Sequence, residues 1–205
     1  MKSIAILGAS GHGKVIAEIA ELSGYQKIVF FDDNKTEKLF EFWKIQGDTK
    51  NLISNLSIFD ACIVAIGNNK IRMEKINLLL LNNANIISLI HPLASVSLYS
   101  KIQKGSVVMA GAVINPFVNI GISCIINTNS TIEHDCMIGH GVHVSPNVAI
   151  AGGVSVGDET WIGIGSSVKQ NIKIGSHVIL GIGSVLLKNL PNKVTAYGIP
   201  AKIIL

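Results

Sequence analysis

The feature of this sequence that most constrains its fold is a six-residue period between positions 90 and 186. Every sixth residue in this stretch is Ile, Val or Leu, over seventeen positions without a change of register. The series is Ile90, Val96, Ile102, Val108, Ile114, Ile120, Ile126, Ile132, Ile138, Val144, Ile150, Val156, Ile162, Val168, Ile174, Leu180 and Leu186. Neither a helix nor a strand alternation repeats at six residues, so each repeat is predicted to be a short strand followed by a sharp turn.

Three such repeats would close a triangular coil of about 18 residues, and stacked coils would form a prism. The aliphatic residue would point inward, and the residue four positions later is mostly small or β-branched. The residue directly after the aliphatic one is often glycine (Gly121, Gly139, Gly157, Gly163, Gly175 and Gly181), which we expect to permit tight backbone at the bend. Coils stacked about 4.8 Å apart would make a prism roughly 25 Å tall. We therefore predict a left-handed parallel β-helix; a sandwich of ordinary strands would not need a constant register.

The composition fits such a core and limits the classes of function. The chain is 48% hydrophobic but only 5% aromatic, as expected when Ile and Val ladders replace a conventional core. Its longest apolar runs, such as Leu78–Leu81, are far short of the ~20 residues that span a bilayer. No secretory signal pattern opens the chain, so a soluble, cytoplasmic protein is expected. The net charge of +4 comes from scattered lysines, which suits anionic small molecules and gives little support for nucleic-acid binding.

The three cysteines are predicted to be reduced packing residues. Cys62, Cys124 and Cys136 are odd in number and lack CxxC spacing. Cys124 and Cys136 occupy the small-residue position of the repeat. We therefore expect neither a disulfide framework nor a cysteine metal site.

Residues 1–90 follow a different pattern, which predicts a Rossmann-like α/β domain. Ser3–Leu7 is an apolar strand, and the loop Gly8–Gly13 follows it. A helix then carries Val15, Ile16, Ile19 and Ala20 on one face, and Lys27–Phe31 is a second strand that ends at Asp32 and Asp33. Glycines let the backbone approach a phosphate, a helix N-terminus favours anions, and the two acids lie where a ribose or base edge would arrive.

This nucleotide-binding pattern is not specific for one cofactor. The loop spacing is GxxGxG and not the GxGxxG of dinucleotide-binding folds, so no NAD site follows from it. His12 within the loop is either a ligand-binding residue or a plain turn residue. The domain is small, so we expect it to bind or orient a ligand and not to form an independent enzyme.

The remainder of this first domain is less patterned. Phe42 and Trp43 are expected to pack a helix onto the sheet. A third strand over Cys62–Ile66 ends at Gly67, a helix spans about Lys70–Asn82, and Ile86–Ile90 is a short fourth strand. We therefore place the domain boundary between residues 90 and 91: a nucleotide-binding domain over 1–90 and a β-helix over 91–205, capped by a tail that contains Pro191, Gly198 and Pro200.

Three of the six histidines (His134, His140 and His143) lie within ten residues of one another in the β-helix and outside its inward positions. One interpretation is a general base, with His134 assisted by Asp135 if turn geometry brings the carboxylate back to the imidazole. A second is a three-histidine zinc site of the hydratase type, although position 98, about two coils upstream, is Leu98. A third is a structural or nucleotide-sensing solenoid with surface histidines, as His140 and His177 are expected to be.

The chain resembles the bacterial sugar O-/N-acyltransferases related to the sialic acid O-acetyltransferases, and within them the UDP-4-amino-sugar N-acetyltransferases of the N-acetylbacillosamine pathway. The similarity covers essentially the whole chain. It rests on six segments: Gly8–Gly13, Phe31–Asp33, Ala65–Asn69, Ile132–Cys136, His143–Ser145 and Gly198–Lys202. The bacillosamine enzymes carry Glu beside the base where this chain has Asp135.

This resemblance implies a homotrimer with acetyl-CoA in grooves between adjacent prisms, and direct transfer to a sugar amine without a covalent intermediate. His134 would be the catalytic base and Asp135 would increase its basicity. His143 would contact the thioester, and backbone near Ile164 and Ile182 would line the pantetheine groove. The residues implied to hold the nucleotide are Ser10, Gly11, His12, Asp32, Asp33 and Gly67. A sugar O-acetyltransferase of the sialic acid type is the alternative, and the acidic Asp135 favours the amine acceptor.

Overall fold

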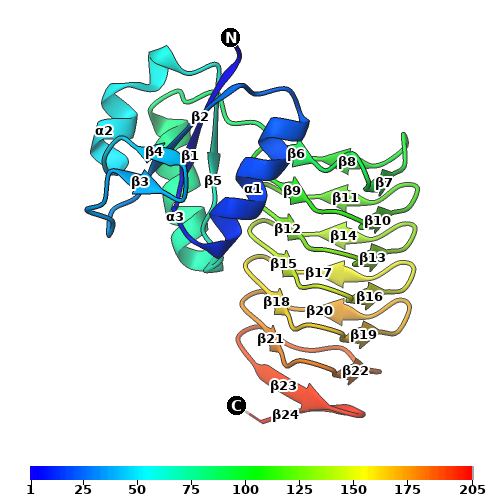
Figure 1. The fold of residues 1–205 in the computed structure, drawn as a ribbon. Helices are drawn as coiled ribbons and strands as arrows, with labels where there is room; N and C mark the ends of the chain where they lie inside the picture. Colours follow the sequence, from blue (N-terminus) through cyan, green and yellow to red (C-terminus); the bar gives the residue numbers. More distant parts are fainter. Residues whose placement is uncertain (205) are drawn as a thin grey trace. The chain divides into compact units, whose positions relative to one another are not determined.

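The computed structural model describes residues 1–204, and their contacts divide the chain after Pro92 into two compact units. The first unit is a parallel α/β sheet and the second is a β-helix, as the sequence predicts (Figure 1). The first unit contains β1 (Ser3–Leu7), α1 (Gly11–Leu22), β2 (Lys27–Phe31), β3 (Leu39–Phe40), β4 (Trp43–Ile45), α2 (Thr49–Ser54), the 3₁₀ turn η1 (Leu56–Ile58), β5 (Ala61–Val64), α3 (Asn69–Leu81) and β6 (Leu89–Ile90).

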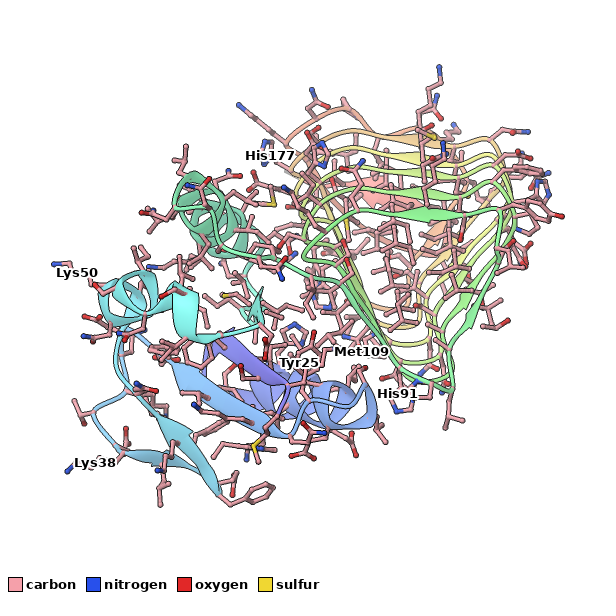
Figure 2. The ribbon with its side chains drawn as sticks, turned by 90° about the horizontal axis from the view of Figure 1, so that it is seen from above. Tyr25, Lys38, Lys50, His91, Met109 and His177 are labelled. Atoms are coloured by element: carbon pink, nitrogen blue, oxygen red, sulfur yellow. The ribbon has the colours of Figure 1, made fainter. Side chains whose placement is uncertain are left out.

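The sheet of the first unit has the order β3-β4-β2-β1-β5, and β1 pairs in parallel with both β2 and β5. Figure 2 shows α1 on one face of this sheet and α2 and α3 on the other. All five residues of β1 are buried, which is the pattern of a central strand covered on both faces. The chain passes from β1 to β2 on one side, and after β4 it crosses to β5 on the other side of β1, so the strand order reverses next to β1.

Three details of the first unit differ from the sequence prediction. Of the residues expected on one face of α1, Ile16, Ile19 and Ala20 are buried as predicted, whereas Val15 is 37% exposed. Phe42 is 75% exposed and packs no helix, because residues 39–45 form the antiparallel pair β3–β4 at the sheet edge. Trp43 packs against Phe30, with ring centroids 5.6 Å apart. The prediction that Phe42 and Trp43 pack a helix onto the sheet was wrong, because this segment is itself a strand pair at the sheet edge.

The second unit is a triangular prism of two-residue strands, seen end-on in Figure 2. Its strands are β7 (Ser95–Val96), β8 (Lys101–Ile102), β9 (Val107–Val108), β10 (Val113–Ile114), β11 (Asn119–Ile120), β12 (Ile125–Ile126), β13 (Thr131–Ile132), β14 (Met137–Ile138), β15 (His143–Val144), β16 (Ala149–Ile150), β17 (Ser155–Val156), β18 (Trp161–Ile162), β19 (Ser167–Val168), β20 (Lys173–Ile174), β21 (Ile179–Leu180) and β22 (Val185–Leu186). Each of the strands from β7 to β19 pairs in parallel with the strand 18 residues later, for example Ile114 with Ile132. The second residue of each strand forms the core, and from Val108 onward these residues are buried. The first predicted member, Ile90 in β6, is 40% exposed instead.

The corner glycines have a different physical role from the one expected. The bends are made by every sixth residue from 105 to 183, each of which has a positive φ, such as Gly105 and Asn129. Gly139 and Gly157 do not have positive φ; they follow the inward residue, and a Cβ there would come within 2.5 Å of Asp158 Oδ1 and Ser176 N respectively. These glycines therefore allow successive coils to approach, and the bend itself is made two residues later.

The small residues of the repeat join successive coils by hydrogen bonds. Thr160 Oγ1 donates to Gly175 O at 2.7 Å and accepts from Val178 N at 3.1 Å, and Ser106 and Ser166 are placed in the same way. The three cysteines are buried, as predicted for packing residues, and Cys136 Sγ lies 3.3 Å from Ala151 O. Burial raises the pKa of the Cys62 thiol to about 12, which fits a packing residue.

The C-terminal tail covers the open end of the prism. β23 (Thr195–Gly198) pairs in parallel with β21, and β24 (Ala201–Ile203) turns back antiparallel to β23. The tail thus occupies the hydrogen-bonding edge of the last coil, as expected for a chain that must protect an open sheet edge. Within residues 1–204, none of the helices is long and apolar enough to cross a membrane.

Candidate functional site

A pocket of about 230 Å³ lies at the carboxyl ends of β1, β2 and β5. In open α/β sheets ligands bind at the carboxyl ends of the strands, at the point where the strand order reverses. Here that point lies next to β1. The pocket is lined by Leu7, Gly8, Ser10, Asp32, Asp33, Asn34, Ile66, Gly67, Ile71 and Lys75. Four of the six residues expected to hold a nucleotide therefore line one pocket. Gly11, at the start of α1, and His12 are not among the lining residues.

The glycine loop is tightly packed at the base of this pocket. Gly8 has a φ of 116°, and a Cβ on it would lie 2.7 Å from Ala65 O. A Cβ on Gly13 would lie 2.5 Å from Gly8 O, so α1 begins directly against the loop. Glycine is needed at both positions because no side chain would fit between the loop after β1 and its neighbours.

Two adjacent acids at the end of β2 have different partners. Asp32 accepts hydrogen bonds from Ala9 N at 2.7 Å and Asn34 N at 2.8 Å, and so fixes the glycine loop to β2. Asp33 accepts from Thr49 N at 2.8 Å and from Lys75 Nζ at 2.5 Å. Desolvation acts to raise the pKa of Asp33, but the hydrogen bonds from Lys75 and Thr49 outweigh it and hold the pKa below its usual value. The Asp33 carboxylate is therefore charged at neutral pH and paired with a cation that also lines the pocket.

A buried cation lies behind the pocket and fixes the loop after β5. The Arg72 side chain is 1% exposed, and its Nη1 donates to Ile66 O and Gly67 O, each at 2.9 Å. The pKa of His12 is lowered to about 4. Burial of the imidazole is the larger cause, and electrostatic repulsion by the Arg72 guanidinium is the second. His12 Nε2 is buried and accepts or donates no hydrogen bond in the structure. His12 is therefore neutral at physiological pH.

The depressed pKa of His12 predicts a loss of stability on mild acidification. The unfolded chain binds a proton at this residue below its ordinary pKa of 6.5, whereas the folded chain does so only below about 4. The stability present above pH 6.5 should therefore fall between pH 6.5 and 4, by about 3 kcal/mol in total, and level off below. Urea unfolding at pH 7.5 and 5.0 measures this loss, which should shrink in His12→Gln. Equal losses in the two proteins would contradict the assignment.

A histidine–carboxylate pair lies at one corner of the prism, between β13 and β14. His134 Nδ1 lies 2.7 Å from Asp135 Oδ2, and both side chains are more than half exposed. Asp135 has a φ of 61°, so its backbone is left-handed. This turn brings the carboxylate back to its neighbour, which two adjacent residues on an extended strand could not achieve. Because a carboxylate only accepts hydrogen bonds, Nδ1 carries the proton and Nε2 is left as the free acceptor.

The coil below positions the imidazole. A Cβ on Gly152 would lie 2.7 Å from both Cε1 and Nε2 of His134, so the ring rests on this glycine. Gly153 N donates to His134 O at 2.9 Å, and Asp135 N donates to Pro116 O in the coil above at 3.2 Å. The pair is thus held between two neighbouring coils, with its outer side open to a ligand.

The residues expected to contact acetyl-CoA lie on other parts of the same prism. His143, in β15, is half-buried, and its Nε2 is 3.2 Å from Asn127 Nδ2. Ile164 and Ile182 occupy equivalent corners one coil apart and are 51% and 69% exposed, and Gly183 N donates to Ile164 O at 2.8 Å. The two isoleucines form a continuous apolar strip on the outside of the prism.

His134 and His143 lie at opposite ends of one prism face within a single chain. His134 lies at the corner before β14, whereas His143 lies in β15, beyond the corner that follows β14. The structure therefore does not bring the two residues together in one copy. The other histidines have separate roles: His140 Nδ1 accepts from Ile122 N at 3.0 Å as a corner bridge, and His177 lies on the outside of the prism (Figure 2). Among residues 1–204, no three His, Cys, Asp or Glu side chains are grouped to hold a metal ion.

Sequence reasoning missed three residues that shape these sites. Arg72 and Lys75 follow the N-cap residue Asn68 by four and seven positions, and so lie on the first turns of α3 beside the pocket. A polar residue at helical spacing after a strand–glycine turn is the signal that could have indicated them. Gly152 could be recognised only from its position 18 residues after His134, once the coil length was known.

The fold defines a class: a hexapeptide-repeat β-helix protein with a Rossmann-like N-terminal domain. Residues 3–79 match the family described as the PglD N-terminal domain. Over 118 residues the chain is 39% identical to UDP-N-acetylbacillosamine N-acetyltransferase of Bacillus subtilis (strain 168), an alignment that covers 54% of this chain and 52% of that protein. The chain thus spans about half the length of this curated relative.

Two solved structures match the chain over nearly its whole length. The acetyltransferase domain of PglB from Neisseria gonorrhoeae FA1090, in complex with acetyl coenzyme A, has a TM-score of 0.95 at 37% identity over 99% of each chain. PerB from Caulobacter crescentus, in complex with CoA and GDP-perosamine, has a TM-score of 0.95 at 33% identity over 100% of this chain and 98% of that one. The chain belongs to the family of nucleotide-sugar N-acetyltransferases that includes the bacillosamine and perosamine enzymes. The resemblance expected from the sequence motifs is thereby confirmed.

Proposed function

We propose that this protein transfers an acetyl group from acetyl-CoA to the 4-amino group of a nucleotide-linked 4-amino-4,6-dideoxy sugar, with UDP as the expected nucleotide. The observation that carries the proposal is the 2.7 Å contact between His134 Nδ1 and Asp135 Oδ2, which leaves Nε2 free as a base. Family membership supports the reaction class, and the pocket beside Asp32 and Lys75 supports an anionic nucleotide ligand. The apolar strip of Ile164 and Ile182 suits the pantetheine arm.

The chemistry follows from the free nitrogen of His134. The neutral sugar amine attacks the thioester carbonyl carbon and the C–N bond forms, while His134 Nε2 removes a proton from the attacking nitrogen. Asp135 stabilises the imidazolium that results. The C–S bond then breaks, and the proton passes to the departing CoA sulfur, so that the products are the amide and CoA thiol. No cysteine is placed as an acyl carrier, because Cys124 and Cys136 are buried in the prism.

We further propose that the working form is a homotrimer in which the acetyl-CoA site lies between adjacent copies. The support is the separation of His134 and His143 by a full prism face within one chain. If His143 contacts the thioester, it must do so from a neighbouring copy. Sedimentation equilibrium of the full chain measures this directly, and a monomer with full activity would contradict it.

A panel of acceptors tests the function and its alternatives. Acetyl-CoA and the protein are incubated with UDP-, GDP- and dTDP-linked 4-amino sugars and with free sialic acid, and CoA thiol release is measured. We expect release only with a nucleotide-linked amino sugar. Release with sialic acid alone would establish the O-acetyltransferase alternative, and the absence of release with every acceptor would favour a non-catalytic solenoid.

The nucleotide role of the first unit predicts the kinetics of Asp32→Ala. Loss of a charged hydrogen-bonding group should raise the KM of the nucleotide sugar by about tenfold or more while the KM of acetyl-CoA is unchanged. Asp32→Asn, which keeps one carbonyl oxygen for Ala9 N, separates loss of charge from loss of the loop contact. Glu37→Ala is the control, because Glu37 is an exposed acid of the same segment outside the pocket. Unaltered sugar-nucleotide KM in both Asp32 variants would remove this role.

A further inference from the structure

One of the turn positions of the β-helix, each of which has a positive φ, is occupied by a bulky apolar side chain. Every sixth residue from 105 to 183 has a positive φ, and most of these positions hold Gly, Asn or Asp, which adopt this conformation at little cost. The occupants are Gly105, Gly111, Phe117, Ser123, Asn129, Asp135, Gly141, Asn147, Gly153, Glu159, Gly165, Asn171, His177 and Gly183. Phe117, with a φ of 64°, is the one apolar side chain among them. For a bulky residue this conformation is strained.

The strain at Phe117 is not offset by burial. Its side chain is 59% exposed, and it stacks on Tyr99, which is 69% exposed, with ring centroids 5.7 Å apart and planes inclined by 29°. In a chain that is only 5% aromatic, two stacked rings thus face outward on a corner where Asn would fold better. Strained residues of this kind are concentrated at ligand-binding sites.

The aromatic pair belongs to the same corner as the proposed catalytic residues. Tyr99, Phe117 and Asp135 occupy one column at intervals of 18 residues, and Asp135 N donates to Pro116 O, which shows that the two corners are directly stacked. Successive coils are about 4.8 Å apart. Phe117 is therefore one coil, and Tyr99 two coils, from the corner that carries His134, and both lie on the same outer surface of the prism. Phe117 is further held by Asn119, whose Nδ2 donates to Phe117 O at 3.3 Å.

We propose that Tyr99 and Phe117 form an aromatic platform that binds the apolar face of the acceptor sugar while its amine lies at His134. This inference rests on the proposed function and specifies how its acceptor is held. A 4,6-dideoxy sugar presents C–H groups and a methyl group, which pack against the faces of aromatic rings, and it offers few hydroxyls for polar recognition. Such a platform would favour deoxy sugars over their hydroxylated counterparts.

The test uses a substitution that relieves the backbone strain. Phe117→Asn introduces the residue found at three equivalent corners, so the fold is expected to be retained and the melting temperature to be unchanged or higher. The KM of the amino-sugar nucleotide should rise about three- to tenfold, with the KM of acetyl-CoA unchanged. Phe117→Tyr should restore the wild-type KM. Lys193→Asn, at an exposed corner that also has a positive φ, is the matched control and should change neither KM.

Binding measurements distinguish the sugar from the nucleotide as the bound group. In calorimetry the affinity of Phe117→Asn for the amino-sugar nucleotide should fall, while its affinity for the nucleoside diphosphate alone stays unchanged. Equal losses of affinity for both ligands would overturn the proposal. A change in the oligomeric mass of Phe117→Asn would also overturn it, because Tyr99 and Phe117 would then form a contact between copies of the chain. Wild-type transfer with an unaltered acceptor KM in Phe117→Asn would refute the platform and leave the proposed function intact. Absence of transfer in the wild-type protein would instead refute the function.

Discussion

Replacing His134 with asparagine is expected to lower kcat for acetyl transfer by a factor on the order of 10²–10⁴, the usual contribution of a positioned general base. Asparagine retains hydrogen-bonding capacity at the site but cannot take a proton from the sugar amine. His134 rests on Gly152 and bonds Asp135 through Nδ1, so its Nε2 is the nitrogen that this variant removes. The KM of acetyl-CoA should change little, because the contacts proposed for the coenzyme lie at Ile164 and Ile182. Initial rates of CoA release measure both constants.

The matched control is His177→Asn. His177 is also an exposed histidine near an acid of the same prism, with its Nδ1 3.9 Å from Glu159 Oε2, yet it lies on another corner. Its variant should keep wild-type kcat. Asp135→Asn should give a smaller loss than His134→Asn, because it removes the stabilisation of the imidazolium and leaves the base. Near-wild-type turnover in His134→Asn would place the base elsewhere in the protein.

Gly157→Ala is expected to destabilise the β-helix by about 2–4 kcal/mol. The new Cβ would lie 2.5 Å from Ser176 N and 2.6 Å from Gly175 C, both of them backbone atoms of the next coil that cannot rotate away. The coils must separate locally, which weakens the Gly157 N to Ile174 O bond of 2.8 Å and the Asp158 N to Ser176 Oγ bond of 3.1 Å. Equilibrium unfolding in urea gives the change in free energy.

The control for this substitution is Ser155→Ala, two residues earlier on the outward side of β17. It changes a side chain on the same coil without a contact between backbones, so its effect should be below about 0.5 kcal/mol. Similar effects of the two substitutions would mean that the glycine is not required for coil spacing. That result would restore our first interpretation, in which glycine serves only the bend.

The fold was accessible from the sequence because its determinant is periodic and local. One aliphatic residue in six fixes the inward face of each short strand. Three repeats make one coil, so that an aliphatic residue lies directly above another aliphatic residue in the next coil, as Ile114 does with Ile132. Segments without a period were predicted less well. Phe42 and Trp43 were expected to pack a helix onto the sheet, yet residues 39–45 form the β3–β4 pair, because edge strands are decided by packing partners and not by local pattern.

The two kinds of structure, the glycine loop with its acids, and the adjacency of His134 and Asp135 could be predicted from the chain alone, because each is encoded by spacing along it. Four relations became visible only in the folded chain: Arg72 holds the loop after β5, Lys75 lines the pocket, Gly152 supports the imidazole, and Phe117 is a strained, exposed ring in the same corner as Asp135. These relations connect residues one coil or one crossover apart. The physical reason is that hydrogen bonds, steric contact and left-handed backbone are set by neighbours in space, which a linear pattern does not specify.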